Sequence, residues 1–165
     1  MTGVQTCALP IFVQNEGEKR GAVARVGKLT EPMNANFTPI TIQSPAEFKG
    51  PAAENGKSLY WTPEDLFVAS LAVCSMTTFV TIAENSNLNY KSLEISAMGR
   101  LERGENAPEM FTEIEETFKL VLLSENDRNK ALRILEKVDE NCLIAKSMKT
   151  KIKPKYEISI NQTKI

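Results

Sequence analysis

The chain has 165 residues, of which 42% are hydrophobic and 25% are charged, and its net charge is −1. This length suits one globular domain with a sizeable core, and the near-neutral charge gives no electrostatic reason to expect nucleic acid or a membrane as a partner. The sequence contains no histidine, which excludes Ser-His-Asp and Cys-His catalysis and the common histidine-based metal sites. Acid–base chemistry must therefore use Glu, Asp, Lys, Tyr, Cys or a bound water.

Residues 1–11 are expected to be foreign to the folded protein. The segment TGVQTCALPI, residues 2–11, back-translates codon by codon to ACT GGA GTT CAG ACG TGT GCT CTT CCG ATC, a common short-read sequencing adapter. The segment also lacks the basic residues of a signal peptide. The alternative is a native N-terminal strand. On the adapter interpretation Cys7 carries no chemistry, residues 12–165 form a single domain, and the true N-terminus is missing.

Residues 12–43 have the pattern of short strands separated by turns. Residues 22–26 and 37–43 are β-branched runs, and Pro39 is typical of a strand start or an edge strand. EGEKRG, residues 16–21, has the composition of a turn. Residues 44–58, SPAEFKGPAAENGKS, contain two prolines and two glycines and are predicted to form a loop.

A long helix is predicted next. Thr62, Pro63 and Asp65 provide an N-cap, a proline at the first helical position and an acid at the third. Residues 66–83 are apolar on nearly every side, which indicates a helix buried all round. A membrane span competes with this interpretation, but hydroxyl residues interrupt a run that is close to the minimum spanning length of about 17 residues. Because a domain of this size rarely wraps one helix completely, we expect a partner subunit to cover it in a homodimer.

Two strands, an amphipathic helix and a final strand complete the predicted order. GENAP, residues 104–108, joins the two strands as a hairpin loop, and a capping box at 124–127 begins the helix. This order is typical of an α+β protein rather than a parallel βαβ sheet. The residues expected to face inward are Leu93, Ile95, Ala97, Leu101, Ile114, Phe118, Leu120, Leu122, Ala131, Leu132, Leu135, Val138, Ile152, Tyr156, Ile158 and Ile160.

Two further thiols are Cys74, in the middle of the apolar helix, and Cys142, after the amphipathic helix. Few cysteines and no signal sequence favour the cytoplasm. We expect Asn141 to cap a short helix that begins at Cys142, whose thiolate gains from unpaired backbone N–H groups, whereas Cys74 lacks that help and needs a cation. If the two thiols meet, a thiolate can attack a peroxide, become a sulfenic acid and form a disulfide with the other thiol. From spacing alone, two buried structural cysteines remain an open alternative.

The segment TPEDLFVASLAVCSMTTF, residues 62–79, resembles the signature helix of the OsmC/Ohr family of thiol-dependent organic hydroperoxide reductases, with Pro63, Glu64 and Cys74 at matching positions. NCLIA, residues 141–145, is similar to the segment that carries the family's second cysteine. Leu143 stands where hydroperoxide reductases of this family typically have proline, and the loop before the helix is longer and less glycine-rich. These features resemble a less characterised branch of the family.

The resemblance implies antiparallel sheets wrapped around a long buried helix in an intertwined homodimer, with no cofactor. It implies that Cys74 attacks an organic hydroperoxide, that Cys142 resolves the sulfenic acid as a disulfide, and that a dithiol or thiol reductant restores both. Arg20 matches the arginine that holds the cysteine as a thiolate, with Arg25 as the alternative, and Glu64 matches the glutamate that orients this arginine. Ten residues of helix separate Glu64 from Cys74 by about 15 Å, so the glutamate is expected to come from the second subunit.

We also expect an apolar cleft, lined by residues such as Leu71 and Phe79, that admits an organic peroxide and shelters the sulfenic acid. Cys142 is expected on the exposed face of a turn. The alternative function is an OsmC-fold binding or stress protein with little or no peroxidase turnover.

Overall fold

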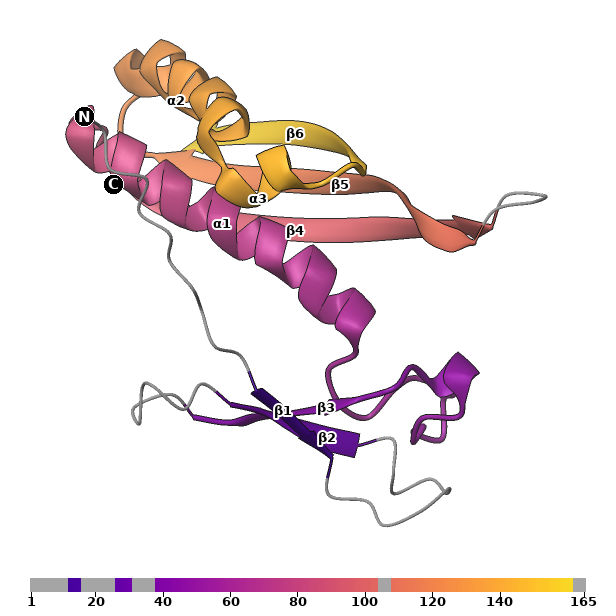
Figure 1. Ribbon diagram of the computed structural model, residues 1–165. Coiled ribbons are helices and arrows are strands. Elements are labelled where there is room, and N and C mark those ends of the chain that lie inside the picture. Colours follow the sequence, from indigo (N-terminus) through magenta and orange to yellow (C-terminus); the bar gives the residue numbers. More distant parts are fainter. Residues whose placement is uncertain (1–11, 16–25, 31–37, 104–107, 162–165) are drawn as a thin grey trace, which may run out of the picture. The chain divides into compact units, whose positions relative to one another are not determined.

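The computed structural model of the protein describes residues 12–15, 26–30, 38–103 and 108–161. The chain divides into two compact units, Met1–Leu66 and Phe67–Ile165. Each unit has its own three-stranded sheet (Figure 1).

The sheet of the first unit consists of β1 (Phe12–Asn15), β2 (Val26–Thr30) and β3 (Ile40–Gln43), in that order and all antiparallel. β3 begins directly after Pro39, as predicted. β2 begins at the last residue of the predicted 22–26 run, and residues 22–25 lie outside the described part of the chain.

The predicted loop after β3 is organised by the side chain of Gln43, which is only 3% exposed. Its Oε1 accepts hydrogen bonds from the backbone N–H groups of Leu59 and Tyr60, at 3.2 and 3.1 Å. Its Nε2 donates to the carbonyl oxygen of Pro51 at 2.8 Å. Within the loop, Ala46–Phe48 form one turn of 3-10 helix. One buried amide therefore holds the far end and the middle of the loop against the end of β3.

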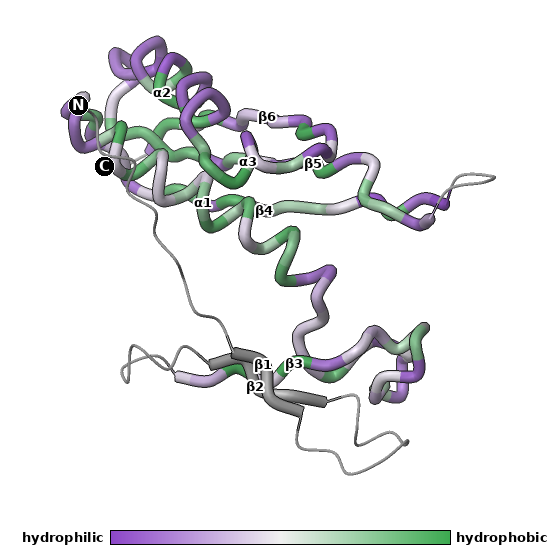
Figure 2. Tube along the Cα trace, in the orientation of Figure 1, coloured by the Kyte–Doolittle hydropathy of each residue, from purple (hydrophilic) through white to green (hydrophobic). Residues whose placement is uncertain are grey.

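The long helix α1 (Pro63–Asn85) begins as predicted. The Thr62 Oγ1 atom accepts a hydrogen bond from the backbone N–H of Asp65 at 3.2 Å, and the Asp65 Oδ2 atom accepts one from the backbone N–H of Thr62 at 3.0 Å. Each side chain thus satisfies a backbone donor that the first turn leaves unpaired. The apolar character of α1 extends over much of its length (Figure 2).

Within one chain α1 is buried along one side only, and burial on every side stays a prediction that depends on the expected partner subunit. Its buried residues, Leu71, Ser75, Phe79 and Ala83, recur at every fourth position and form one stripe. Elsewhere on the helix, Val73 and Met76 are 56% and 44% exposed. By length and composition α1 could cross a membrane. In this fold, however, the buried stripe packs on a sheet, as in the core helix of a soluble protein.

The sheet of the second unit has the order β4-β5-β6, formed by β4 (Tyr90–Arg103), β5 (Glu109–Leu122) and β6 (Lys151–Ile160). β4 and β5 are antiparallel, as a hairpin requires, although residues 104–107 of the predicted loop are outside the described residues. β6 is parallel to β5, so the sheet is mixed rather than wholly antiparallel. The reason is that helices α2 (Arg128–Asn141) and α3 (Leu143–Ser147) carry the chain back along the sheet before β6 begins. The predicted α+β class is confirmed.

Helices α1 and α2 cover the same face of this sheet and enclose the core. Two predicted core residues are exposed instead. Leu101 follows an irregularity in the β4–β5 register, and on α2 it is Ile134 rather than Leu132 that faces inward. The other predicted residues are buried or pack against the core. On the opposite face of the sheet, carboxylates of β5 pair with lysines of β6, for example Glu115 with Lys155 at 2.7 Å.

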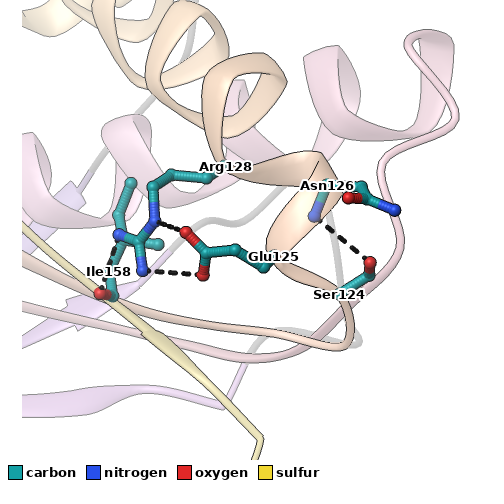
Figure 3. A network of polar contacts seen from close by, with 5 residues as sticks. All are labelled: Ser124, Glu125, Asn126, Arg128 and Ile158. Carbon is teal, nitrogen blue, oxygen red and sulfur yellow. Dashed lines mark hydrogen bonds and ion pairs between the residues drawn. The ribbon is translucent and has the colours of Figure 1, made fainter.

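The start of α2 is fixed by the polar contacts drawn in Figure 3. The Ser124 Oγ atom accepts a hydrogen bond from the backbone N–H of Asn126 at 3.3 Å, which caps a short 3-10 turn (Glu125–Asp127). Arg128 pairs with Glu125 and also donates from Nη1 to the carbonyl oxygen of Ile158 at 3.2 Å. This contact ties the first turn of α2 to the last strand.

Candidate functional site

The structure brings two of the four predicted site residues together. Cys74 lies half-buried on α1, and Cys142 lies buried at the junction of α2 and α3. Both belong to one apolar cluster, centred on the buried residues Leu71, Ile114 and Cys142, against which Cys74 packs. The thiols are close enough to share a hydrogen bond. The approach of two cysteines that are far apart in the sequence is thus a property of the fold.

The other predicted residues are described only in part. Arg20 and its alternative Arg25 lie outside the described residues. Glu64 lies in the first turn of α1, where an acidic side chain is favoured by the helix dipole. Its Oε2 atom is buried and has no hydrogen-bond partner among the described residues.

The surroundings of Cys142 differ from the prediction in two respects. Asn141 does not cap the short helix; it is the last residue of α2, and its Nδ2 donates to the carbonyl oxygen of Lys137 at 2.7 Å. Cys142 itself is the N-cap of α3, and its Sγ accepts a hydrogen bond from the backbone N–H of Ala145 at 3.4 Å. The residue is also 1% exposed rather than on an open turn, because it continues the buried stripe of α2 four residues after Val138.

The pKa of the Cys74 thiol is lowered from its ordinary value. Burial is the largest single influence and acts in the opposite direction, but it is outweighed by hydrogen bonds from the Cys142 thiol, the backbone of Ile144 and Leu143, and the Thr78 side chain. The expectation that Cys74 lacks help from a helix N-terminus is therefore wrong. Although Cys74 lies in mid-helix, the first backbone N–H groups of a different helix, α3, stabilise its thiolate.

The pKa of the Cys142 thiol is raised, first by burial and then by its hydrogen bond to Cys74. The hydrogen bond from the backbone N–H of Ala145 and the contact with Ser75 lower the pKa, but these effects are smaller. The two sulfurs therefore divide their roles: negative charge is favoured on Cys74, and a protonated thiol is favoured on Cys142. A thiolate beside a protonated thiol is the starting arrangement for disulfide chemistry.

Two further polar residues reach the thiol pair, and the sequence analysis missed both. The Ser75 hydroxyl lies 3.1 Å from Oε2 of Glu116 and 3.8 Å from Sγ of Cys142. Glu116 is 1% exposed, and burial raises the pKa of its carboxyl group to about 7, although the Ser75 hydrogen bond opposes the shift. The signal was present in the alternation of β5, where Glu116 occupies an inward position between Ile114 and Phe118.

A family model described as OsmC-like protein matches residues 55–157, which is more than half of the chain. The chain belongs to the OsmC family. This confirms the family resemblance of the α1 segment and of the segment around Cys142. Among curated protein sequences, none matches this chain.

Solved structures share the OsmC fold with this protein. An OsmC-like protein of unknown function from Vibrio cholerae O1 biovar eltor is 18% identical, with a TM-score of 0.73 over 92% of this chain and 99% of that one. An organic hydroperoxide resistance protein from Elizabethkingia anophelis is 17% identical, with a TM-score of 0.66 over 94% and 99%. The organic hydroperoxide resistance protein OhrB of Bacillus subtilis is 22% identical, with a TM-score of 0.55 over 90% and 97%.

The space around the thiols of this OsmC-family protein is not the predicted cleft. Leu71 and Phe79, which were expected to line it, are fully buried in the core. A groove of about 560 Å³ lies between the second half of α1 and the end of α2. Thr78, a neighbour of Cys74, is part of its lining, but neither thiol is. Among the described residues, no group of three or more Cys, Asp or Glu side chains could hold a metal ion.

Proposed function

We propose that this OsmC-family protein is a cytoplasmic, thiol-dependent peroxidase that reduces organic hydroperoxides. The observation that carries the proposal is the adjacent pair of thiols, with the pKa of Cys74 lowered and that of Cys142 raised. A nucleophilic thiolate next to a protonated second thiol is what a two-cysteine peroxidase needs at the start of its cycle.

The reaction requires neither histidine nor a metal. The Cys74 thiolate attacks the terminal oxygen of the hydroperoxide; the S–O bond forms, the O–O bond breaks, and the alkoxide takes a proton to leave as an alcohol. Cys142 then attacks the sulfur of the Cys74 sulfenic acid; the S–S bond forms, the S–O bond breaks, and water leaves. A dithiol or thiol reductant returns both cysteines to the starting state.

Arg20 and Glu64 complete the proposed site, with Arg25 as the alternative to Arg20. A cation beside Cys74 would lower its pKa further. The buried Glu64 Oε2 atom, without a partner among the described residues, is an acceptor suited to an arginine. Since Glu64 and Cys74 are about 15 Å apart along α1, we propose that the glutamate is contributed by the second subunit of a homodimer. The exposed Val73 and Met76 support a partner over this helix.

The substrate class is supported by the relatives. The structures from Elizabethkingia anophelis and Bacillus subtilis are of proteins named for resistance to organic hydroperoxides. At their identities of 17% and 22% they establish the fold, so the substrate must be tested on this chain.

The test is a titration with cumene hydroperoxide, followed by counting of free thiols and intact-mass spectrometry. In the wild-type protein one equivalent should consume both thiols together. Cys74→Ser should abolish peroxide consumption, whereas Cys142→Ser should consume about one equivalent and stop at a sulfenic acid that a dimedone-type probe traps. Hydrogen peroxide should react more slowly than cumene hydroperoxide. Survival of both thiols in excess organic hydroperoxide would replace the proposal with a binding or stress function.

The arginine is tested by a matched pair of variants. Arg20→Ala should slow oxidation of Cys74 near neutral pH and should regain rate at higher pH, because its effect is to keep the thiolate populated. Arg25→Ala is the control. If only Arg25→Ala slows the oxidation of Cys74 and regains the rate at higher pH, Arg25 is the arginine that stabilises the thiolate.

A further inference from the structure

The mechanism above leaves one step without a proton acceptor. Cys142 must lose its proton to attack the sulfenic acid, yet its pKa is raised by burial and by its neighbour Cys74. Cys142 is only 1% exposed, so bulk water has little access to its thiol. A proton acceptor inside the protein is therefore needed, and the part of the chain that the structure describes places one there.

We propose that Ser75 and Glu116 form a proton relay that takes the proton from Cys142 when it attacks the Cys74 sulfenic acid. The proposal deepens the peroxidase function above and rests on it. Three buried groups from three elements form a chain of contacts. They are the Cys142 thiol at the α2–α3 junction, the Ser75 hydroxyl of α1 and the Glu116 carboxyl of β5. The distances are 3.8 Å from sulfur to hydroxyl and 3.1 Å from hydroxyl to carboxylate oxygen.

The Ser75 hydroxyl has one proton and two neighbours, which gives the relay two arrangements. In the first, the Cys142 thiol donates to Ser75, and Ser75 donates to the Glu116 carboxylate. In the second, protonated Glu116 donates to Ser75, and Ser75 donates to the Cys142 thiolate. The two arrangements differ only in the positions of two protons, one between Cys142 and Ser75 and one between Ser75 and Glu116. No heavy atom has to move between them.

The step balances without an added reagent. The Cys142 proton passes to the Ser75 oxygen while the Ser75 proton passes to Glu116 Oε2. The Cys142 sulfur forms the S–S bond with Cys74, and the S–O bond of the sulfenic acid breaks. The departing hydroxide takes a proton from solvent and leaves as water. Glu116 later returns its proton to solvent or to the restored thiol.

The electrostatic surroundings suit this role. Burial, opposed by Ser75 and reinforced by the negative charge of Asp139 on α2, brings the pKa of Glu116 to about 7, so that both of its protonation states are populated near neutral pH. On β6 the register partner of Glu116 is Pro154, and Tyr156, two residues further on, donates to Asp139 Oδ2 at 2.6 Å. On β4 the register partner is the uncharged Ala97.

A purely structural role does not explain Glu116. The carboxyl group lies in a stripe of β5 whose other inward members, including Ile114, Phe118 and Leu120, are fully buried apolar residues. Its Oε1 atom has no hydrogen-bond partner among the described residues, and an unpaired buried oxygen lowers stability. An apolar side chain would serve the core better, so the acid is retained at a cost to stability.

The experiment follows single-turnover disulfide formation as a function of pH. Reduced protein is mixed with one equivalent of cumene hydroperoxide, quenched with an alkylating reagent, and divided by intact mass into sulfenic acid and disulfide forms. Sulfenic acid formation reports on Cys74, and its conversion to disulfide reports on Cys142. The variants are Glu116→Gln, Ser75→Ala and Glu116→Asp, with Glu115→Gln as the matched control because Glu115 lies next to Glu116 on the opposite face of β5.

In the wild type, and equally in the control, the rate of disulfide formation should rise with pH through a midpoint near 7. Glu116→Gln and Ser75→Ala should each slow this step about 100-fold near pH 7.5 and move its midpoint above the ordinary thiol range, while sulfenic acid formation changes little. Glu116→Asp, which keeps the acid, should restore part of the rate. A wild-type rate and pH profile in Glu116→Gln would overturn the relay, whereas a wild-type protein that forms no sulfenic acid would instead overturn the peroxidase function. If Glu116→Gln fails to fold, an unchanged profile in Ser75→Ala overturns the relay alone.

Discussion

The buried carboxyl of Glu116 should make the stability of the protein depend on pH in a way that Glu116→Gln removes. The glutamine is nearly isosteric and can still accept the hydrogen bond from Ser75, but it does not titrate. The comparison therefore isolates the ionisation of one group, whose carboxyl has a pKa of about 7 in the folded protein against an ordinary value of 4.5.

The direction and magnitude follow from these two values. Between about pH 4.5 and about pH 7 the folded state holds a proton that the unfolded chain has released, so the free energy of unfolding falls as the pH rises. This contribution is fully present below about pH 4.5 and is lost above about pH 7. At 1.36 kcal/mol per unit of pKa, the loss is up to about 3 kcal/mol.

The assay is urea unfolding at about pH 5 and about pH 8, under reducing conditions and at one protein concentration. The wild type should lose up to about 3 kcal/mol more than Glu116→Gln between these two pH values. Other titrating groups are present in both proteins, and the charge of Asp139 is the smallest of the three influences on the pKa of Glu116, so they contribute little to the difference. Glu115→Gln, which removes a half-buried carboxylate paired with Lys155 on the opposite face of the sheet, should follow the wild type. Parallel pH dependences for the wild type and Glu116→Gln would refute the assignment of a raised pKa to Glu116.

Four other outcomes are expected. Gly99→Ala should cost about 1–3 kcal/mol in chemical unfolding, because a β-carbon there would lie 2.6 Å from a ring carbon of Phe111 and 2.8 Å from a methyl group of Val68; a stability equal to wild type would contradict this packing. Thr62→Ala should cost about 1 kcal/mol by loss of the cap of α1, and an unchanged melting temperature would show that the cap contributes nothing. Sedimentation should find a homodimer, and a stable folded monomer at micromolar concentration would exclude a partner over α1. Deletion of residues 1–11 should leave the melting temperature unchanged, whereas a loss of several degrees would identify a native strand.

Local patterns in the sequence predicted much of the fold. The cap at Thr62 located the start of α1, and the period-two alternation located β4 and β5, because both signals depend on residues close together in the chain. The direction of β6 was not predictable in this way. Whether a strand pairs parallel or antiparallel depends on the path of the helices before it, and no residue within β6 encodes that path.

The site was predictable to a smaller extent. The positions of Cys74 and Cys142 came from the sequence, but the support that Cys74 receives from Leu143 and Ile144 is tertiary. It requires the first turn of α3 to lie against the side of α1. The burial of Cys142 was misjudged although it continues the stripe of Val138. Glu116 was missed because the inward face of an alternating strand is recognised by its apolar residues. Glu116 is the polar exception on that face.

The three backbone contacts of the Gln43 side chain also bear on how this chain can vary. One buried amide holds Pro51, Leu59 and Tyr60 against the end of β3. Between these points the chain forms a small turn, in which Ala52 pairs with Ser58, so the ends of the loop are held. Lengthening a loop whose ends are held costs little, since each doubling adds only about 0.6 kcal/mol of closure entropy. We therefore expect substitution of Gln43 to disrupt the conformation of this segment more than a change in the length of the loop.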